Sequence, residues 1–243
     1  MVIIDSHCHL SNRFGTGPAS WLIESLDGAG VDKACVFSDN KFVEKAVEEY
    51  PDRFIPFVYF DPRYEESDLD EVDSYVGEKG WKGIKVGHQF PVARSMYPMM
   101  EKAESYGALV VIHSDHTPKD HPYIIGDIAN SFPKVNTVIF HMGSGVILDS
   151  ELVSIKIAEK NPNVYLETSY SHPYAIKKSV ETLGADRVMF GSDASNGGYG
   201  LHYDNPADYI DIHLDAVRLC NLPKDQEDMV MCGTIAKLLE VDL

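Results

Sequence analysis

The sequence has few positively charged side chains. Lysine and arginine together number 21, against 38 aspartates and glutamates, so the formal net charge is -17. A surface that binds nucleic acid or anionic lipid needs clustered Lys and Arg. We therefore expect neither a nucleic acid nor a membrane as partner, and instead a small-molecule substrate. Assembly into a homo-oligomer is left open by the pattern.

Cysteines are also scarce, and long apolar stretches are absent. The four cysteines show no paired spacing, and no hydrophobic leader precedes Asp5. No apolar stretch approaches the roughly 20 residues that a membrane-spanning helix needs. We expect a reduced, cytoplasmic protein.

Short apolar runs recur along the whole chain and alternate with helix-compatible segments. Eight runs are predicted to be strands: 3–8, 33–37, 54–60, 83–86, 109–113, 137–141, 164–168 and 187–191. Near-continuous apolar strands are typical of a parallel sheet that is buried on both faces. The alternation predicts a (β/α)8 TIM barrel in a single domain, residues 1–243, with an open doubly wound sheet as the alternative. The barrel is favoured because it brings the first and last strands together.

Histidine or aspartate stands at the end of several of these runs. Side chains in a strand alternate between its two faces, so His7 and His9 point the same way. His113, His141 and Asp193 each follow a later run. All strand C-termini open on one face of a parallel barrel, so we expect these five side chains to converge.

Nitrogen and oxygen ligands of this kind suit a metal ion. Zinc is the expected ion, with manganese or another divalent ion as the alternative. A divalent ion lowers the pKa of a bound water from about 15.7 toward 7. Asp193 can then act as the general base while the water attacks a carbonyl-type carbon.

Other polar residues of the same face carry weaker predictions. His116, His172 and Arg94 are candidate substrate-binding residues, and for each of them a solvated loop position is the alternative. Glu167 also lies near this face, but the pattern assigns it no role. Cys8 lies between the two histidines and is expected to point outward, toward the helices, as an inert thiol.

The strand-end motifs resemble those of the amidohydrolase superfamily, in particular its amidohydrolase-related branch of small metal-dependent barrel enzymes. The resemblance rests on Asp5-Ser6-His7-Cys8-His9, on His113, on His141-Met142-Gly143 and on Phe190-Gly191-Ser192-Asp193. It implies a metal held by His7, His9, His113 and Asp193. It also implies that His141 is a second-metal ligand or a group that orients water and polarises the substrate.

Lys85 stands at the end of the fourth predicted strand. Some members of the superfamily carboxylate a lysine there to bridge two metals. The branch more usually has a single metal, so Lys85 is a ligand only if two ions bind. An ion pair with a carboxylate or a substrate anion is the other interpretation.

Four functions fit these predictions to different degrees. The favoured one is a metal-dependent hydrolase that acts on a small amide, lactone or ester. A lyase reaction, the nonoxidative decarboxylation of a small aromatic or cyclic carboxylic acid, uses the same kind of site. A TatD-type deoxyribonuclease has a similar opening motif, but its mid-chain and last-strand motifs are missing here and the acidic balance disfavours it. A catalytically silent metal-binding barrel is the fourth hypothesis.

Overall fold

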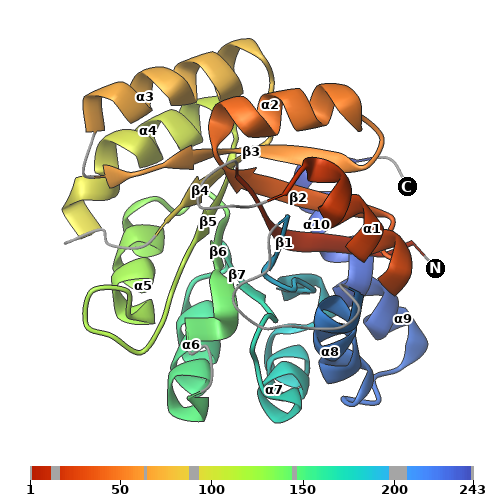
Figure 1. Cartoon of the computed structure of the whole chain (residues 1–243). Helices are drawn as coiled ribbons and strands as arrows, with labels where there is room; N and C mark the ends of the chain where they lie inside the picture. Colours follow the sequence, from red (N-terminus) through yellow and green to blue (C-terminus); the bar gives the residue numbers. More distant parts are fainter. Residues whose placement is uncertain are drawn as a thin grey trace.

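The chain folds around one continuous, curled parallel sheet with helices on its outside (Figure 1). The computed structural model describes residues 2–11, 17–62, 65–87, 93–143, 147–196 and 207–241. The strands follow one another in the order β8-β7-β6-β5-β4-β3-β2-β1-β9, and every pairing is parallel. Sequential parallel strands that are joined by outer helices define the (β/α)8 barrel that the sequence predicts.

The strands lie where the apolar runs predict them, but the strands late in the chain end earlier than predicted. They are β1 (Ile4–Leu10), β2 (Lys33–Ser38), β3 (Phe54–Phe60), β4 (Gly83–Val86), β5 (Leu109–Ile112), β6 (Thr137–Ile139), β7 (Val164–Glu167), β8 (Val188–Met189) and β9 (Ala194–Ser195). The predicted strand at 187–191 is thus reduced to two residues, and the chain turns before β9 continues beside β1.

The helices follow the strands in alternation. The α-helices are α1 (Ala19–Ala29), α2 (Asn40–Glu49), α3 (Glu65–Val72), α4 (Tyr97–Tyr106), α5 (Pro122–Ser131), α6 (Leu148–Lys160), α7 (Pro173–Leu183), α8 (Ala207–Arg218), α9 (Lys224–Asp228) and α10 (Thr234–Leu239). Short 3-10 or π segments are η2 (Asp73–Glu78), η3 (Ala93–Met96), η4 (Phe140–Gly143), η5 (Ala185–Arg187) and η6 (Met229–Gly233). Across the described ranges, no helix combines the length and apolarity needed to cross a bilayer.

Local sequence signals set several helix boundaries. Asp39 caps α2, because its carboxylate accepts a hydrogen bond from the backbone N–H of Phe42. The helix α4 ends at Gly107, whose φ of 66° lies in the left-handed region that glycine adopts without a steric penalty. Such signals set the start of α2 and the end of α4.

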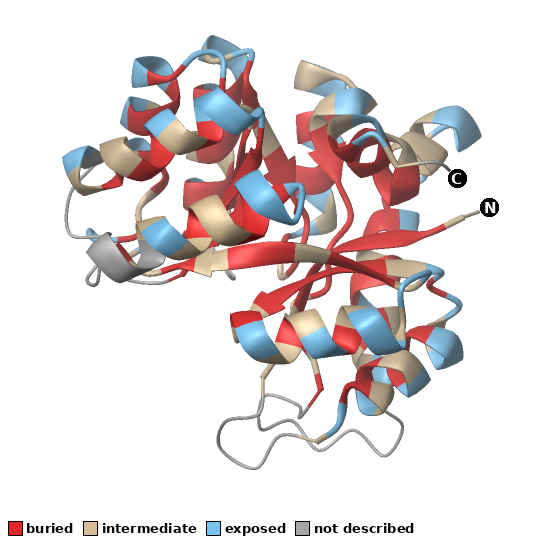
Figure 2. Ribbon diagram, turned by 90° about the horizontal axis from the view of Figure 1, so that it is seen from above, coloured by how far each residue is buried: buried red, intermediate tan, exposed pale blue. Residues whose placement is uncertain are grey.

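Two apolar cores lie on the two sides of the sheet. One fills the space between strands and helices, and it includes Cys8, which confirms that this thiol points away from the barrel interior. The other fills the barrel interior with residues such as Phe37, Phe57 and Phe140, and α10 packs against it through residues such as Ile235. Figure 2 shows the consequence: the strands are mostly buried, whereas the helices are buried on one side only.

The two ends of the sheet meet between β1 and the end of β8. The backbone N–H of Ser6 donates to the carbonyl of Phe190 at 3.0 Å, and the Ser6 hydroxyl donates to the same oxygen at 2.6 Å. Cys8 of β1 then pairs with Ala194 of β9. The first and last strands are therefore neighbours, as the barrel prediction requires.

The Asp5 carboxylate holds this closure from inside the protein. It is fully buried, and it accepts hydrogen bonds from the backbone N–H groups of His7 and Ser192, both at 3.0 Å, and from the Ser192 hydroxyl at 2.5 Å. Burial raises the pKa of Asp5 to about 6, and these hydrogen bonds oppose that rise only in part. The folded protein thus keeps the proton of this side chain up to a higher pH than the unfolded chain does.

We predict that Asp5→Ala and Asp5→Asn have very different effects on stability. The alanine variant leaves three buried donors without an acceptor, at about 1–3 kcal/mol each, so its free energy of unfolding should fall by several kcal/mol. The amide of asparagine has the same shape, can accept both backbone hydrogen bonds and can donate to the Ser192 hydroxyl. We expect Asp5→Asn to fold with at least wild-type stability at neutral pH.

Urea unfolding at several pH values checks this prediction. The wild type loses stability as pH rises from the ordinary aspartate pKa of 3.8 to about 6, because the folded state resists ionisation of Asp5. Asparagine has no such proton, so the stability of Asp5→Asn relative to wild type should increase over that interval. A difference that does not change with pH would contradict the assignment.

Candidate metal centre and active site

Three side chains with metal-binding atoms meet at the end of β1. His7 and His9 point into the barrel, since Cys8 and Leu10 between and beyond them belong to the outer core. Asp193 Oδ1 lies 2.9 Å from the Nε2 atoms of both histidines, which are 3.3 Å from each other. One ligand atom from each residue falls within 4.8 Å of the others. Two imidazoles and a carboxylate form a donor set that suits zinc or manganese.

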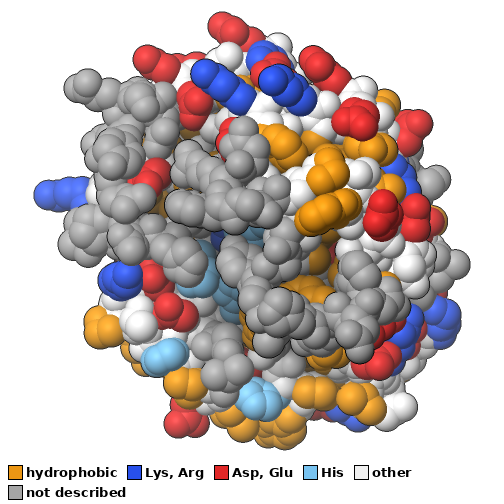
Figure 3. Space-filling view, in the orientation of Figure 1, with side chains coloured by type: hydrophobic (Ala, Val, Ile, Leu, Met, Phe, Trp, Pro, Cys, Tyr) orange, Lys and Arg blue, Asp and Glu red, His pale blue; other side chains and the backbone are white. Residues whose placement is uncertain are grey.

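The structure thus brings these three predicted residues together, and their role as metal ligands stays a prediction. His7 is 1% exposed, whereas His9 and Asp193 are 19% and 14% exposed, so the cluster can be reached from solvent. Figure 3 shows histidine side chains near the middle of this face, with most of the visible acidic and basic side chains toward its periphery. The orientation of the His9 ring is also fixed, since its Nδ1 lies 2.6 Å from the hydroxyl of Ser38 at the end of β2.

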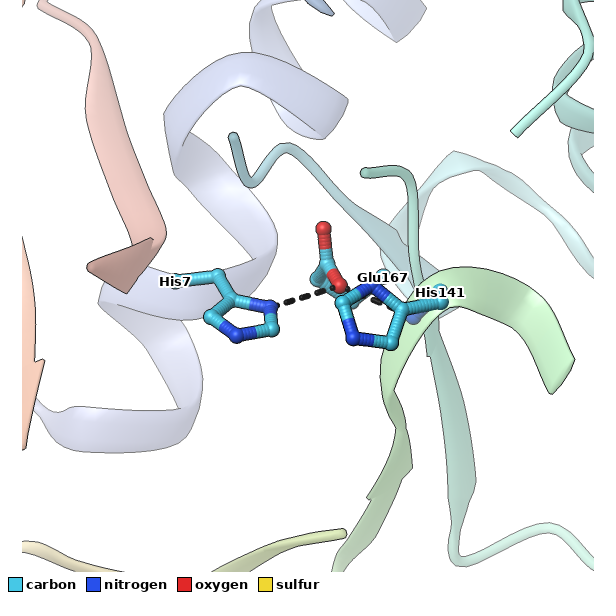
Figure 4. Close-up of side chains that lie close together, drawn as sticks. All are labelled: His7, His141 and Glu167. Carbon is cyan, nitrogen blue, oxygen red and sulfur yellow. Dashed lines mark hydrogen bonds and ion pairs between the residues drawn. The ribbon is translucent and has the colours of Figure 1, made fainter. Parts of the chain in front are cut away.

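His7 has a second carboxylate partner, on its other ring nitrogen. Its Nδ1 lies 3.1 Å from Oε2 of Glu167, the last residue of β7. The same oxygen accepts a hydrogen bond from the backbone N–H of His141 at 3.0 Å. Figure 4 shows Glu167 between the two histidines, and these three residues form a second group with ligand-type atoms close together.

His141 lies just after β6, in a turn where it and Met142 have φ values of 59° and 48°. This left-handed backbone is costly for residues other than glycine and is concentrated at functional sites. His141 Nδ1 lies 2.7 Å from the Ser169 hydroxyl, and Nε2 lies 3.1 Å from Nδ1 of His113. Its ring centroid is 4.9 Å from that of His7. His141 therefore lies beside His7 and bonds Ser169 and His113 through its two ring nitrogens.

His113 follows β5 and lies one step farther from the cluster. Its ring contacts His141, and its Nε2 is 3.8 Å from Oδ2 of Asp115. It groups with Asp115 and Asp120, and among the described residues it does not share the close group of His7, His9 and Asp193. The structure thus places His113 on the correct face and beside His141, but its role as a ligand of the same ion stays a prediction.

Lys85 is buried in the barrel interior beneath these residues. It is 2% exposed, and its Nζ lies 4.3 Å from the ring centroid of Phe140 and 5.3 Å from that of Phe37. Burial lowers the pKa of Lys85 to about 7, although the carboxylates of Asp193 and Glu167 oppose this shift. The geometry fits a buried amine that faces aromatic rings, and its role as a bridge between two metals stays a prediction.

Three predicted substrate-binding residues lie apart from the cluster. His116 and Arg94 are exposed, and neither has a hydrogen bond or ion pair with a described residue of the cluster. His172 begins α7, and its Nδ1 lies 2.9 Å from Oε2 of the buried Glu151 on α6. None of the three bonds a described residue of the metal-ligand group, and the role of His116, His172 and Arg94 in substrate binding stays a prediction.

The pKa shifts separate the charged members of the cluster from the neutral ones. Burial would raise the pKa of Asp193, but His7 and His9 outweigh it and hold that pKa well below its ordinary range. Burial lowers the pKa of His141 to about 3 and that of His9 to about 4. At neutral pH Asp193 is therefore a carboxylate, and these two imidazoles carry a lone pair that can bind a metal ion or accept a proton.

Sequence reasoning missed the polar residues that support the cluster. Glu167, Ser169, Ser38 and Asp5 each bond a site residue or its backbone. Glu167 had a visible signal, because the run at 164–168 ends on a carboxylate as other runs end on histidine. The serines had no such signal, since single hydroxyls occur throughout the sequence.

The fold and the cluster together define a class of protein: a (β/α)8 barrel with histidines and carboxylates gathered at the C-terminal ends of its strands. The model of the amidohydrolase family (Amidohydro_2) matches residues 4–241. The chain belongs to this family, so the prediction made from the strand-end motifs is confirmed. Among the curated proteins, no match was found.

Solved structures with the same fold include enzymes that catalyse different reactions. One is 5-carboxyvanillate decarboxylase from Novosphingobium aromaticivorans, with a TM-score of 0.72, 14% identity and coverage of 98% of this chain and 97% of that one. A probable 2-pyrone-4,6-dicarboxylic acid hydrolase from Acinetobacter baumannii has a TM-score of 0.70 and 14% identity, with coverage of 99% of this chain and 100% of that one. The 4-oxalomesaconate hydratase from Rhodopseudomonas palustris has a TM-score of 0.68 and 16% identity, with coverage of 99% of this chain and 96% of that one. At these identities the similarity establishes the fold.

We predict that Lys85→Met stabilises the protein at neutral and acidic pH. Methionine has a similar length and no charge to desolvate, and replacing buried charge by apolar side chains is often stabilising by about 1–4 kcal/mol. The free-energy cost of burying the charged form of Lys85 is fully present below pH 7. It disappears as pH rises toward 10.5, because the unfolded chain then also loses this proton.

Thermal or urea unfolding of Lys85→Met and wild type over this pH range measures the effect. The advantage of the variant should shrink steadily as pH rises above 7. Lys33→Met, on the partly exposed first residue of β2, serves as a control that should show no such trend. An equal advantage at every pH would show that Lys85 does not titrate as described.

Proposed function

We propose that this protein is a metal-dependent hydrolase that acts on a small carbonyl-type substrate, such as an amide, lactone or ester. The single observation that carries the proposal is the contact of His7, His9 and Asp193 at the mouth of the barrel, where one carboxylate oxygen meets two Nε2 atoms. Family membership supports it, since the match covers residues 4–241.

The donor set of the cluster fits a divalent ion, which His7, His9 and Asp193 would hold, with His113 as a further candidate ligand. We propose zinc, with manganese as the alternative, because imidazole and carboxylate ligands suit both ions. The 5-carboxyvanillate decarboxylase that shares this fold was solved with bound manganese. When bound, such an ion polarises substrate oxygens and lowers the pKa of water.

Asp193 and His141 are the residues proposed to move protons. Asp193 is held as a carboxylate, so it can accept a proton as general base and return it to the leaving group. His141 is neutral at physiological pH, and its Nε2 faces His113. We propose that His141 orients the attacking water or the substrate carbonyl by hydrogen bonding.

Nonoxidative decarboxylation of a small aromatic or cyclic carboxylic acid is the second candidate. The fold is shared with 5-carboxyvanillate decarboxylase and with 2,6-dihydroxybenzoate decarboxylase. The same group of side chains could hold the substrate oxygens while a ring carbon is protonated. A deoxyribonuclease is disfavoured by the net charge of -17, since nucleic acid is bound by clustered basic side chains.

We predict that the purified protein contains about one equivalent of zinc or manganese, as expected for a mononuclear catalytic site. The double variant His7→Ala, His9→Ala should lose it, because two of the three grouped ligand atoms disappear. Inductively coupled plasma mass spectrometry on protein purified without chelator or affinity-tag metal makes the measurement. Near two equivalents would instead assign Lys85 a place among the ligands.

His121→Ala is the matched control for removal of an imidazole. His121 begins α5, where its ring stacks on Tyr123 and its Nδ1 accepts a hydrogen bond from the Tyr123 backbone. This variant should keep the metal. If the wild type held no specific metal even after reconstitution, the catalytic proposal would be wrong and the silent barrel would remain.

Activity assays separate the two reactions. The metal-loaded protein is tested on a panel of lactones, amides and esters, and separately on hydroxybenzoates with detection of carbon dioxide. Loss of a general base typically lowers the rate by about 10²–10⁴-fold, and we expect Asp193→Asn to show a loss of this order. Turnover of hydroxybenzoates alone would favour the decarboxylase.

A further inference from the structure

We infer that Glu167 determines which ring nitrogen of His7, His141 and His113 carries a proton: it accepts from Nδ1 of His7 directly, and it holds a hydrogen on Nδ1 of His141 and His113 through the hydroxyl of Ser169. Glu167 is then a positioning residue for three histidines, one in β1 and the others just after β6 and β5. The inference rests on the proposed function in one respect only, because it assigns Nε2 of His7 to a metal ion.

Every polar neighbour that the structure gives the Glu167 carboxylate is a donor or can be one. The side chain is completely buried, and its oxygens face His7 Nδ1, the backbone N–H of His141, and both the backbone N–H and the hydroxyl of Ser169. The two backbone N–H groups can only donate, and each carboxylate oxygen accepts from one of them. Both oxygens therefore act as acceptors, as in an ionised carboxylate, which has no proton to give.

The consequence for His7 is direct. Its Nδ1 lies 3.1 Å from a carboxylate oxygen and must carry a hydrogen to bond it. The remaining nitrogen, Nε2, is the one that faces His9 and Asp193. A proton on Nε2 is therefore the one that a metal ion displaces, while Nδ1–H stays on Glu167. Carboxylates that hold metal-ligating histidines in this way raise metal affinity.

The proton position of His141 depends on the hydroxyl of Ser169, which lies between this ring and Glu167. The hydroxyl has a single hydrogen, which it donates to Glu167 Oε2 at 2.8 Å. It must then accept from His141, whose Nδ1 lies 2.7 Å away and therefore carries the ring proton. With the proton of the neutral ring on Nδ1, the lone pair is on Nε2. The reverse arrangement would leave two lone pairs facing each other between Ser169 and Glu167.

His113 is the last member of this chain of hydrogen bonds. The lone pair on His141 Nε2 lies 3.1 Å from His113 Nδ1, so that nitrogen must donate. In neutral His113 the lone pair is then on Nε2. One buried carboxylate on β7 thus fixes the proton positions of residues that follow β6 and β5.

The backbone leaves room for this carboxylate at Gly191. A Cβ atom at this position would lie 2.4 Å from Oε1 of Glu167 and 2.8 Å from its carboxyl carbon. Any larger residue would therefore displace Glu167. This gives a physical reason for the glycine in the motif Phe190-Gly191-Ser192-Asp193, which the pattern of the sequence left unexplained.

We predict that Glu167→Gln changes the proton positions of these rings and weakens metal binding. Glutamine has one acceptor oxygen and an NH2 group, so it cannot accept from both His7 and Ser169 as the carboxylate does. Long-range ¹H–¹⁵N correlation spectra of the metal-free protein report which ring nitrogen is protonated. His141 and His113 are assigned by the signals lost in His141→Gln and His113→Gln. Both rings should be protonated on Nδ1 in wild type and lose that preference in Glu167→Gln.

Zinc affinity, measured by competition with a chromophoric chelator, is the second readout. Loss of the partner of a metal-binding histidine typically weakens metal binding by about 10–100-fold, and we expect this for Glu167→Gln. Glu151→Gln is the matched control: Glu151 is also a completely buried carboxylate, and it bonds Nδ1 and the backbone N–H of His172 on the outer side of the barrel. This control should leave the zinc affinity and the spectra of His113 and His141 unchanged.

Ser169→Ala separately tests the hydrogen bonds that join Glu167 to His141 and His113. It also keeps the test decisive if Glu167→Gln fails to fold. It should change the spectra of His141 and His113 and leave the His7 ring bonded to Glu167. Unchanged ring protonation in both variants would overturn the inference, even if zinc affinity fell. A wild type that binds no zinc would count against the proposed function, while the spectra of the metal-free protein would still decide the role of Glu167.

Discussion

The closure of the barrel between β1 and the segment after β8 is the constraint on which the rest of the site depends. The bonds from Ser6 to Phe190 and from Ser192 to Asp5 join residues more than 180 positions apart in sequence. Without them His7 and His9 would lie at one edge of an open sheet and Asp193 at the other. The metal-ligand group is therefore a product of closure, and its stability is linked to that of the whole barrel.

Backbone strain is concentrated at the same end of the barrel. Among the described residues, non-glycine positions with positive φ include Ser38 at the end of β2, His141 after β6, Tyr170 after β7 and Asp193 after β8. Two of these are candidate catalytic residues, and Ser38 and Tyr170 contact His9 and His141 respectively. Left-handed backbone is costly for such residues. It persists here because rigid strands and buried hydrogen bonds hold the turns that aim these side chains inward.

Much of the fold could be predicted from the sequence, because alternating apolar runs and helix-compatible segments follow directly from burial of a parallel sheet. The convergence of His7, His9 and Asp193 also followed, since strand ends share one face. The contacts of His113 did not follow, because ring orientation depends on neighbours from other strands. The same holds for His172: its bond to Glu151 joins two helical segments, and no local pattern announces it.

The buried charges around the site fit a bound cation. Asp5 and Glu167 are both fully buried carboxylates, yet burial raises the pKa of Asp5 to about 6 while imidazole donors lower that of Glu167 to about 2. Burial would lower the pKa of His7, but Asp193 and Glu167 outweigh it and raise that pKa, so the two carboxylates stay ionised around an imidazole that they help to protonate. Lys85, with a pKa of about 7, is only partly charged, and His9 and His141 are neutral. A divalent ion bound between His7, His9 and Asp193 would take the place of the proton on His7 Nε2 and would lower the free energy of keeping both carboxylates ionised away from water.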